Sequence, residues 1–557
     1  MPSSAPNAPS AANTPAASTP AATAQPVDTG AVPPFTDLPT LLARNAAQRP
    51  GATAVVVNGQ ALSWAAFDAR ASRVAAALQQ QGLAPRDTVA VCASSSIDYL
   101  AVFMGALRAG VAVAPLAPSA TPEQLAGMAA DADARVVFVD DAVAAALDGA
   151  GLAPQPGVLH PPLRVRLDNS AGAGPGADIG LDAWLAGAPA TPRPVAIQPE
   201  WPFNLIYSSG TTGAPKGIVQ SHAMRWAHIQ RALMSGYGSD TVTLSATPLY
   251  SNTTLVSVIP TLAHGGCVVL MAKFDAAQYL ALAQQHRATH TMLVPVQYQR
   301  LMSRPDFDQH DLSSFRFKFC TSAPFHAELK ADVLKRWPGG LVEYYGMTEG
   351  GGTVILQAHL HPSKLHTVGQ PAPGSDIRLI DEDGIELPQS PGVASPVSGE
   401  VVGRSPGMMS GYHKQPAKTA EAEWFDAQGQ RYIRTGDVGR FDADGFLILH
   451  DRRKDMVISG GFNIYPSDLE AVLRQHPAVA DAAVIGVPSA EWGETPVAVV
   501  VRRAGDGTEA EALRAWVNER VGKTQRLSGL RYTDELPRSA IGKVLKRELR
   551  EAWGAGG

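Results

Sequence analysis

One ten-residue stretch combines hydroxyls, glycines and a lysine in a pattern suited to binding phosphate. It reads Ser-Ser-Gly-Thr-Thr-Gly-Ala-Pro-Lys-Gly over residues 208–217, after an apolar run typical of a strand and before a helical pattern. Glycines let backbone N–H groups approach anionic oxygens, hydroxyls donate hydrogen bonds, and the lysine adds positive charge. We therefore expect a polyphosphate-binding loop, with an ordinary polar turn as the alternative. Its candidate ligands are Ser208, Ser209, Gly210, Thr211, Thr212, Gly213 and Lys216.

The loop is not a Walker A loop, because Lys216 is followed by glycine and not by Ser or Thr. Four later motifs carry residue types that suit nucleotide chemistry. Tyr-Tyr-Gly-Met-Thr-Glu at 344–349 offers a flat face for a base and a carboxylate for a hard cation. Tyr-Ile-Arg-Thr-Gly-Asp at 432–437 ends on a carboxylate that can accept hydrogen bonds from ribose hydroxyls. The others are a charged run at 451–455 with Gly-Gly-Phe-Asn-Ile at 460–464, and Pro-Arg-Ser-Ala-Ile-Gly-Lys at 537–543.

In this order, the loop and the four motifs resemble the signature motifs of the adenylate-forming superfamily. That superfamily includes acyl-CoA synthetases, 4-coumarate:CoA ligases, luciferases and peptide-synthetase adenylation domains. The resemblance covers about residues 35–552 and is greatest to carboxylic acid:CoA ligases; Gly399-Glu400, Arg404 and Gly411-Tyr412 also fit it. It implies an α/β fold, in which a large N-terminal domain of α/β subdomains and a small antiparallel β subdomain precedes a smaller, mobile α+β C-terminal domain.

The resemblance gives roles to residues that would otherwise pass as ordinary turn or surface positions. Glu349 is implied to hold Mg²⁺, Thr348 to contact the α-phosphate, and Tyr345 to stack on adenine. Asp437 is implied to bind the ribose hydroxyls. Outside the loop, the implied ATP- and AMP-binding residues are Ser322, Ala323, Pro324, Tyr345, Gly346, Asp437 and Arg452.

Lys543 is implied to be the catalytic lysine of adenylation, where its ammonium would meet negative charge developing between carboxylate and phosphate. The nearby Lys546, Arg547 and Arg550 are better explained as a solvated helix face. Lys454 falls at the family's hinge. Rotation about it would withdraw Lys543 and bring Gly460, Gly461 and Phe462 to the coenzyme A channel.

The acyl pocket is implied to involve a set of small and polar residues. Three glycines follow Glu349 where aryl-acid ligases often carry bulkier residues, so we expect a roomier or differently shaped pocket. His222 could equally be structural. Apolar neighbours and no evident counter-ion favour an apolar acid, either aromatic or of medium to long chain. The candidates are His222, Tyr250, Ser322, Gly346, Gly350, Gly351, Gly352 and Thr353.

The implied reaction couples a small carboxylic acid to ATP, giving acyl-AMP and pyrophosphate, and then to coenzyme A, giving acyl-CoA and AMP. ATP, Mg²⁺ and coenzyme A are the expected ligands. One alternative is an enzyme that loads a carrier protein, and another is a degenerate nucleotide- or acyl-binding protein. Luciferase-like oxygenation on the same fold is a less favoured interpretation than the ligase reaction.

Composition agrees with a protein of this kind. The 557 residues carry a net charge of −5, which argues against a protein that binds nucleic acid through bulk positive charge. The three cysteines form no disulfide framework, and Cys92 and Cys267 sit in apolar runs that suggest core positions. No apolar stretch reaches membrane-spanning length. We expect a soluble, cytoplasmic protein; the oligomeric state is left open, with a dimer as one option.

The elements that must position these motifs alternate between helix and strand, which favours a largely parallel sheet covered on both faces. We expect a disordered Ala/Pro/Ser/Thr-rich tail at 1–34, an adenylate-forming domain at 35–452 and a C-terminal lid at 453–557. Residues 168–200 resemble a surface connection. Helices are expected at 38–49, 63–81 and 97–108; strands at 54–57, 88–92, 111–115, 136–139, 482–487 and 497–501; short antiparallel strands within 381–450; and capping boxes at Thr121/Gln124, Ser467/Glu470 and Thr508/Glu511.

Overall fold

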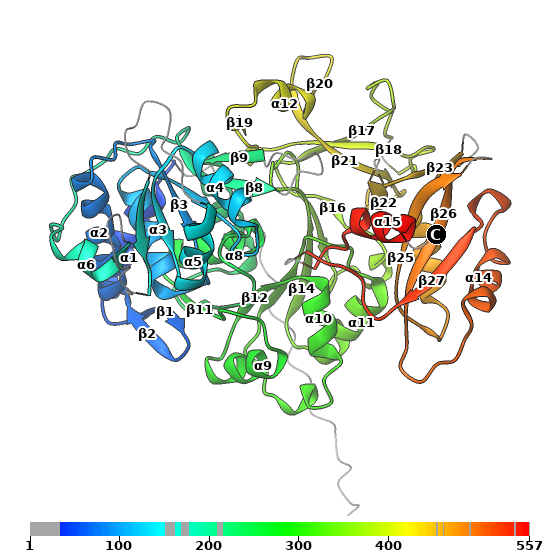
Figure 1. The fold of residues 1–557 in the computed structure, drawn as a ribbon, viewed down its shortest axis with the longest axis horizontal. Coiled ribbons are helices and arrows are strands. Elements are labelled where there is room, and N and C mark those ends of the chain that lie inside the picture. Colours follow the sequence, from blue (N-terminus) through cyan, green and yellow to red (C-terminus); the bar gives the residue numbers. More distant parts are fainter. Residues whose placement is uncertain are drawn as a thin grey trace, which may run out of the picture. The chain divides into compact units, whose positions relative to one another are not determined.

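The computed structural model describes residues 34–150, 162–168, 178–208, 216–390, 392–452, 455–459, 462–489, 492–539 and 542–555. Phe35–Gly557 forms one unit. Except for Pro34, the tail expected at 1–34 lies outside the described residues. The described chain is mixed α/β, with a large N-terminal and a smaller C-terminal domain (Figure 1), as the sequence predicted.

The first large sheet has eight strands in the order β19-β9-β8-β4-β3-β5-β6-β7. Strands β3 to β8 are parallel, whereas β9 runs antiparallel to both β8 and β19. Strands β3 and β4 are buried along their whole length, as expected where both faces of a sheet are covered. The strands are β3 (Thr88–Cys92), β4 (Ala112–Pro115), β5 (Ala134–Val139), β6 (Leu163–Arg166), β7 (Ile179–Gly180), β8 (Pro202–Ser208), β9 (Lys216–Ser221) and β19 (Gly411–Tyr412).

The second large sheet has nine strands in the order β16-β15-β14-β13-β12-β10-β11-β1-β2. Its centre is parallel, and its two edges end in antiparallel pairs. The strands are β1 (Thr53–Val57), β2 (Gln60–Ser63), β10 (Val242–Ser245), β11 (Cys267–Leu270), β12 (His290–Leu293), β13 (Phe317–Cys320), β14 (Gly340–Tyr345), β15 (Val354–Gln357) and β16 (Gln370–Pro371).

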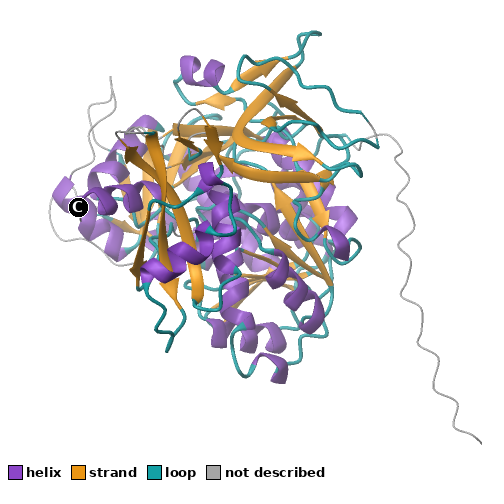
Figure 2. Ribbon diagram, turned by 90° about the vertical axis from the view of Figure 1, so that its right-hand side faces the viewer, coloured by secondary structure: helices purple, strands orange, loops and turns teal. Residues whose placement is uncertain are grey.

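Strand residues alternate between the cores on the two faces of each sheet, because successive side chains point to opposite sides. Val55 and Val89 enter one core shared by both sheets and helices α1–α3 and α8, whereas Val56 and Ala90 enter two outer cores. Helices and strands therefore alternate in layers (Figures 1 and 2). The helices are α1 (Leu38–Gln48), α2 (Trp64–Gln80), α3 (Ile97–Arg108), α4 (Pro122–Asp131), α5 (Asp141–Ala150), α6 (Leu181–Ala186), α7 (His222–Ala232), α8 (Asn252–Ala263), α9 (Ala276–Gln285), α10 (Pro295–Met302) and α11 (Ala327–Arg336).

A smaller antiparallel sheet follows, as predicted for 381–450, with the order β17-β18-β21-β20 and β22 paired to β21. Its strands are β17 (Asp376–Ile380), β18 (Gly399–Arg404), β20 (Glu423–Phe425), β21 (Arg431–Phe441) and β22 (Leu447–Arg452), with α12 (Pro416–Glu421) beside β20. The C-terminal domain has a fourth sheet, β24-β23-β26-β25, with β27 parallel to β26. Its elements are β23 (Val457–Ser459), β24 (Phe462–Ile464), α13 (Pro466–Arg474), β25 (Val479–Ser489), β26 (Gly493–Arg502), α14 (Ala510–Asn518), β27 (Gly529–Thr533) and α15 (Lys546–Ala555). The described residues also contain the 3-10 turns Leu233–Ser235, Phe307–Gln309, Pro362–Lys364 and Lys523–Gln525.

The expected early elements are confirmed with shifts of one or two residues at their ends, and Thr121 forms its capping box. Two other capping boxes are wrong. Helix α13 begins at Pro466 and α14 at Ala510, and neither has a side-chain cap. Glu470 turns away from the helix start because it pairs with Lys546 at 3.0 Å and accepts from the amide of Val484.

Two further expectations need correction. The segment 168–200 is not only a surface connection, since it contains β7 and α6, whose Leu181 and Leu185 are buried. Lys546 and Arg550 are not a solvated face, because they pair with Glu470 and Asp455 and hold α15 in place; Arg547 is exposed as predicted. Within the described residues, no helix is long and apolar enough to span a membrane.

Candidate active site

The predicted phosphate loop connects the two strands of a hairpin. Strand β8 ends at Ser208, which is the register partner of Lys216 at the start of β9. Residues 209–215 lie outside the described part, so the predictions for Ser209, Gly210, Thr211, Thr212 and Gly213 concern residues that the structure does not describe. Lys216 is the first residue of β9, and α7 begins after that strand, at His222. The strand therefore separates the loop from the helix, so the connection is longer than the sequence pattern predicted.

Lys216 lies in a small charged group. Its ammonium is 5.1 Å from the centre of the Tyr412 ring, and the Tyr412 hydroxyl donates to Glu349 Oε1 at 2.8 Å. Burial, together with the neighbouring carboxylate, raises the pKa of Tyr412, so this hydroxyl stays protonated as a donor. Tyr412 thus contacts both the Lys216 ammonium and the Glu349 carboxylate, which are more than a hundred positions apart in the sequence.

The backbone of Thr348 is held by a buried polar network that sequence reasoning missed. Gln220 Nε2 donates to the Thr348 carbonyl at 2.7 Å. Arg225, only 1% exposed, donates to Gln220 and also to Asn204, at 2.9 Å. Burial lowers the pKa of Arg225 to about 9. The sequence did contain a signal for this network: Arg225 lies in the apolar stripe of a helix, and an arginine in such a position indicates a buried polar partner.

The carboxyl ends of the parallel strands gather several predicted residues at one edge of the nine-stranded sheet. Ser322 follows β13, and Tyr345 ends β14. Ser322 has a φ of +82° and shares a 2.7 Å hydrogen bond with Thr253 at the start of α8. A left-handed non-glycine residue costs about 1–3 kcal/mol and occurs often at functional sites. Ala323 is half-buried and Pro324 exposed, beside Ser322.

Tyr345 and Asp437 are in contact. The Tyr345 hydroxyl donates to Asp437 Oδ2 at 2.8 Å. Asp437 is also the Cα partner of Arg452 across β21 and β22, although the side chain of Arg452 is outside the described part. Gly346, the next residue after Tyr345, is exposed. The predicted base and ribose residues are therefore adjacent.

The backbone beside Lys543 lies against the same sheet edge. Gly542 has a φ of +77°, and a Cβ there would be 2.7 Å from Val296, just after β12. Arg538 stabilises this turn by donating to the Gly542 carbonyl at 2.6 Å and pairing with Asp481. Lys543 itself is half-buried. Lys454, Gly460 and Gly461 lie outside the described residues, and only the backbone of Phe462, in β24, is described.

The three glycines after Glu349 do not leave the extra room that was expected. Gly350 and Gly351 have φ values of +77° and +87°, which favour glycine. A Cβ on Gly350 would overlap the Gly407 carbonyl, and one on Gly352 would overlap Ile377. The space that side chains would fill is taken by the antiparallel sheet and its connections, so these glycines allow close packing.

The other acyl-pocket candidates lie on separate elements. His222 begins α7, is buried, and packs edge-on against Phe203 at 5.0 Å. Burial lowers its pKa to about 4, so it is neutral at physiological pH, which favours the structural alternative. Tyr250 is half-buried before α8, and Thr353 accepts a hydrogen bond from Arg231 at 3.0 Å.

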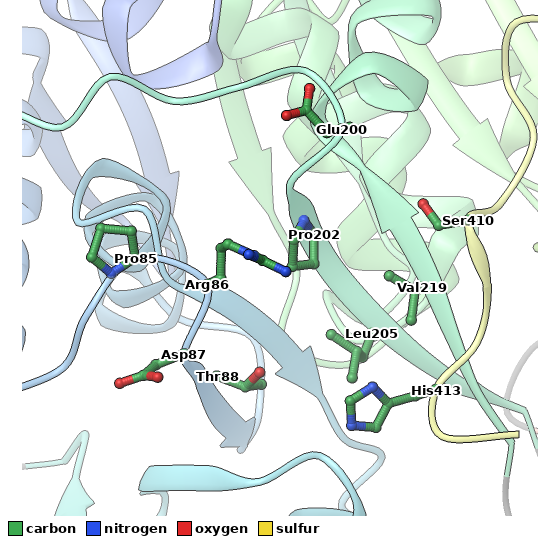
Figure 3. A pocket seen from close by; sticks show the side chains of 10 residues that line it. All are labelled: Pro85, Arg86, Asp87, Thr88, Glu200, Pro202, Leu205, Val219, Ser410 and His413. Atoms are coloured by element: carbon green, nitrogen blue, oxygen red, sulfur yellow. The ribbon is translucent and has the colours of Figure 1, made fainter.

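A separate hollow of about 460 Å³ lies near the amino ends of β3 and β8 (Figure 3). None of the predicted motif residues line it. Its lining residues are Pro85, Arg86, Asp87, Thr88, Glu200, Pro202, Leu205, Val219, Ser410 and His413. The described residues also contain no group of three or more His, Cys, Asp or Glu that could bind a metal by themselves. The hollow is therefore separate from the candidate site.

The α/β fold and a candidate site at the carboxyl edge of a sheet are typical of nucleotide-binding enzymes. The AMP-binding enzyme family model matches residues 42–413, and the model of the family's C-terminal domain matches 468–543. The chain belongs to this family, which confirms the resemblance.

The chain is also similar to named relatives over nearly its full length. It is 34% identical to a feruloyl-CoA synthase from Amycolatopsis sp, covering 92% of this chain and 98% of the relative. It is 32% identical to an indoleacetate–CoA ligase from Aromatoleum aromaticum, covering 91% and 96%. The crystal structure of ATP-bound MatB from Rhodopseudomonas palustris superposes with a TM-score of 0.80 at 29% identity, covering 93% and 99%.

Proposed function

We propose that this enzyme is an ATP-dependent carboxylic acid:CoA ligase that acts through an acyl-adenylate. The carboxylate oxygen attacks the α-phosphorus of ATP, giving acyl-AMP and releasing pyrophosphate. The coenzyme A thiol then attacks the acyl carbon, giving the thioester and releasing AMP. The observation that carries the proposal is the meeting of Lys216, Tyr412 and Glu349 beside the Thr348 carbonyl that Gln220 holds.

The first step brings an anion to a polyanion, so positive charge and fixed geometry matter more than acid–base groups. Lys216 and the loop before it supply charge and hydrogen-bond donors to the phosphates. Asp437 accepts hydrogen bonds from the ribose, and Tyr345 stacks on the adenine. Thr348 contacts the α-phosphate from a backbone that is already held in place.

Glu349 fits a role in holding Mg²⁺. Tyr412 occupies only Oε1, and no described residue hydrogen-bonds to Oε2. Magnesium is commonly bound by one or two carboxylates together with substrate phosphates, which agrees with the lack of a larger acidic cluster among the described residues. When bound, the ion would neutralise phosphate charge.

We propose Lys543 as the catalytic lysine of the first step. The proposed domains are 35–452 and 453–557, with rotation about Lys454 exchanging Lys543 for the segment 460–462 in the second step. The turn that carries Lys543 lies against Val296, near the carboxyl edge that holds Ser322 and Tyr345, which suits the adenylation step. Three free thiols fit a reducing compartment, and we place the enzyme in the cytoplasm.

The acid is proposed to be aromatic. The named relatives act on ferulate and indoleacetate. In this chain, Tyr237, Phe319 and Tyr344 form an aromatic group near α7, with Phe319 and Tyr344 ring centres 5.7 Å apart. Such rings favour stacking with an aryl group.

A panel of aromatic and aliphatic acids tests the proposal through pyrophosphate release, with ATP and Mg²⁺, and with or without coenzyme A. We expect pyrophosphate with an aromatic acid, and a thioester only when coenzyme A is present. Glu349→Gln should raise the Mg²⁺ concentration required. Replacing coenzyme A with an acyl-carrier protein tests the alternative acceptor. Absence of pyrophosphate release with every acid would contradict the proposal.

A further inference from the structure

Strand β9 turns one row of side chains toward residues 347–349. Alternate strand residues point to the same face, so Lys216, Ile218 and Gln220 form this row. Lys216 is the cation of the charged group at the site, and Ile218 packs in a cluster with Met347. Gln220 donates to the backbone of the same segment at 2.7 Å. The strand that begins with the loop lysine therefore also contacts the segment proposed to bind phosphate.

The hydrogen bonds of Gln220 fix the direction in which its amide faces. Arg225 has donors only, so the Gln220 atom that it contacts is the oxygen Oε1. Asn204, the register partner of Gln220 across β8 and β9, donates to the same oxygen at 3.0 Å. Gln220 Nε2 then has the Thr348 carbonyl at 2.7 Å and Asn252 Oδ1 at 3.4 Å as acceptors. The reversed amide would place an oxygen against the Thr348 carbonyl.

Arg225 has neutral acceptors for its charge. Its guanidinium donates to Asn204 Oδ1 at 2.9 and 3.1 Å and to Gln220 Oε1. No carboxylate of the described residues pairs with it. Asn204 and Gln220 are fully buried, and Arg225 is 1% exposed, so water does not complete the network. A carboxylate at position 220 would pair better with the guanidinium, but it could not donate to a backbone carbonyl.

We propose that Gln220 is a positioning residue for adenylation. Its amide, oriented by Arg225, holds the Thr348 carbonyl and so sets the place of the Thr348 hydroxyl, which is proposed to contact the α-phosphate. Glu349 follows directly and is set with it. Gln220 acts through Thr348 and not on the substrate, and the inference rests on the proposed adenylation.

Gln220→Glu separates positioning from stability. The introduced carboxylate would pair with Arg225, which keeps it ionised, and would face the Thr348 carbonyl without a proton to donate. We expect the full chain to melt at the wild-type temperature or above. The kcat for pyrophosphate release should nevertheless fall about ten- to a hundredfold, because small misplacements of reacting groups are costly. The KM for ATP should change less than about threefold, as for an interaction that acts in the transition state.

The double variant Gln220→Glu/Arg225→Met tests whether the lost donor is the cause. Without the guanidinium, the buried carboxyl is protonated, and its O–H can donate to the Thr348 carbonyl as the amide does. We expect kcat to recover about five- to tenfold over Gln220→Glu, the rate equivalent of one hydrogen bond. Both rates are measured with the acid of the panel that the wild type uses best.

Asn45→Asp is the matched control. The buried Asn45 amide donates to the carbonyls of Leu262 and Ala263 at 2.9 and 3.1 Å, on elements that carry none of the nucleotide motifs. This variant should melt at a lower temperature than the wild type and keep its kcat, which is the opposite pattern to Gln220→Glu.

Three results would overturn this inference alone: wild-type kcat in Gln220→Glu, a melting temperature of Gln220→Glu well below that of the wild type, or no recovery in the double variant. The second of these would show that Gln220 has a structural role. No pyrophosphate release by the wild type with any acid would instead overturn the proposed function, and this inference with it.

Discussion

The hydroxyl of Tyr345 donates a hydrogen bond to the carboxylate of Asp437 across 2.8 Å, although 92 positions separate the two residues. The bond joins the nine-stranded sheet to the antiparallel sheet. It fixes the carboxylate proposed for ribose beside the ring proposed for adenine. One contact therefore sets the spacing between the two halves of the proposed nucleoside site before any substrate binds.

Tyr345→Phe keeps the ring and removes this hydrogen bond. We expect the KM for ATP to rise about tenfold with kcat nearly unchanged, because hydrogen bonds to charged groups contribute about 1.5–3 kcal/mol. ATP-dependent pyrophosphate exchange measures both constants. Tyr532→Phe is the matched control, since it removes a hydroxyl bond of 2.9 Å to the Thr508 carbonyl in the C-terminal domain. Equal ATP KM values in the two variants would contradict the proposed role of the pair.

Lys543→Ala should separate the two half-reactions. We expect acyl-adenylate formation to fall about a hundred- to a thousandfold, because a preorganised cation at the developing charge is lost. Thioester formation from supplied acyl-adenylate should stay within a few-fold of the wild type. Arg547→Ala, at an exposed position of α15, should change neither rate. Equal loss of both half-reactions would refute the assignment of Lys543.

Gly350→Ala should impair folding or adenylation even though it adds one methyl group. The residue has a φ of +77°, and the new Cβ would overlap the Gly407 carbonyl. Gly127→Ala is the control, because this α4 glycine has no atom near its Cβ position. Thermal melting should show a loss for Gly350→Ala and a gain of about 0.5–1 kcal/mol for Gly127→Ala. Wild-type stability and activity in Gly350→Ala would show that the segment is loosely packed.

His290 should make the enzyme less stable in acid. It is fully buried, and burial lowers its pKa to about 4. Its Nε2 is 2.8 Å from the Ser235 carbonyl and Nδ1 is 2.8 Å from the Thr289 hydroxyl, which suits the neutral ring. An unfolded histidine titrates near pH 6.5, so between 6.5 and about 4 the unfolded state binds more protons, and stability falls as pH decreases.

His290→Gln should flatten this dependence. From pH 6.5 to 5 we expect the variant to lose about 2 kcal/mol less than the wild type, at about 1.4 kcal/mol per pH unit. Denaturant unfolding at the two pH values measures the difference. His366→Gln, at an exposed position, is the control substitution. Parallel slopes for the wild type and His290→Gln would contradict the inference.

The sequence by itself determined the family, the motif residues and most early elements. Strands such as Thr88–Cys92 and helices such as Ile97–Arg108 have patterns set by their own neighbours. Where a helix end depended on a distant partner, the local pattern failed, as with Glu470, whose carboxylate pairs with Lys546 instead of capping a helix.

Only the tertiary structure decided what the buried charges and the glycines do. The buried Arg225 and the half-buried Arg231 lie on α7, and only the structure shows that they donate to Gln220 and Thr353. Gly350 to Gly352 suggested open space, yet the antiparallel sheet fills it. The reason is physical: composition and periodicity report which face of an element is apolar, whereas the partner of a buried polar group is set by residues brought together from distant parts of the chain.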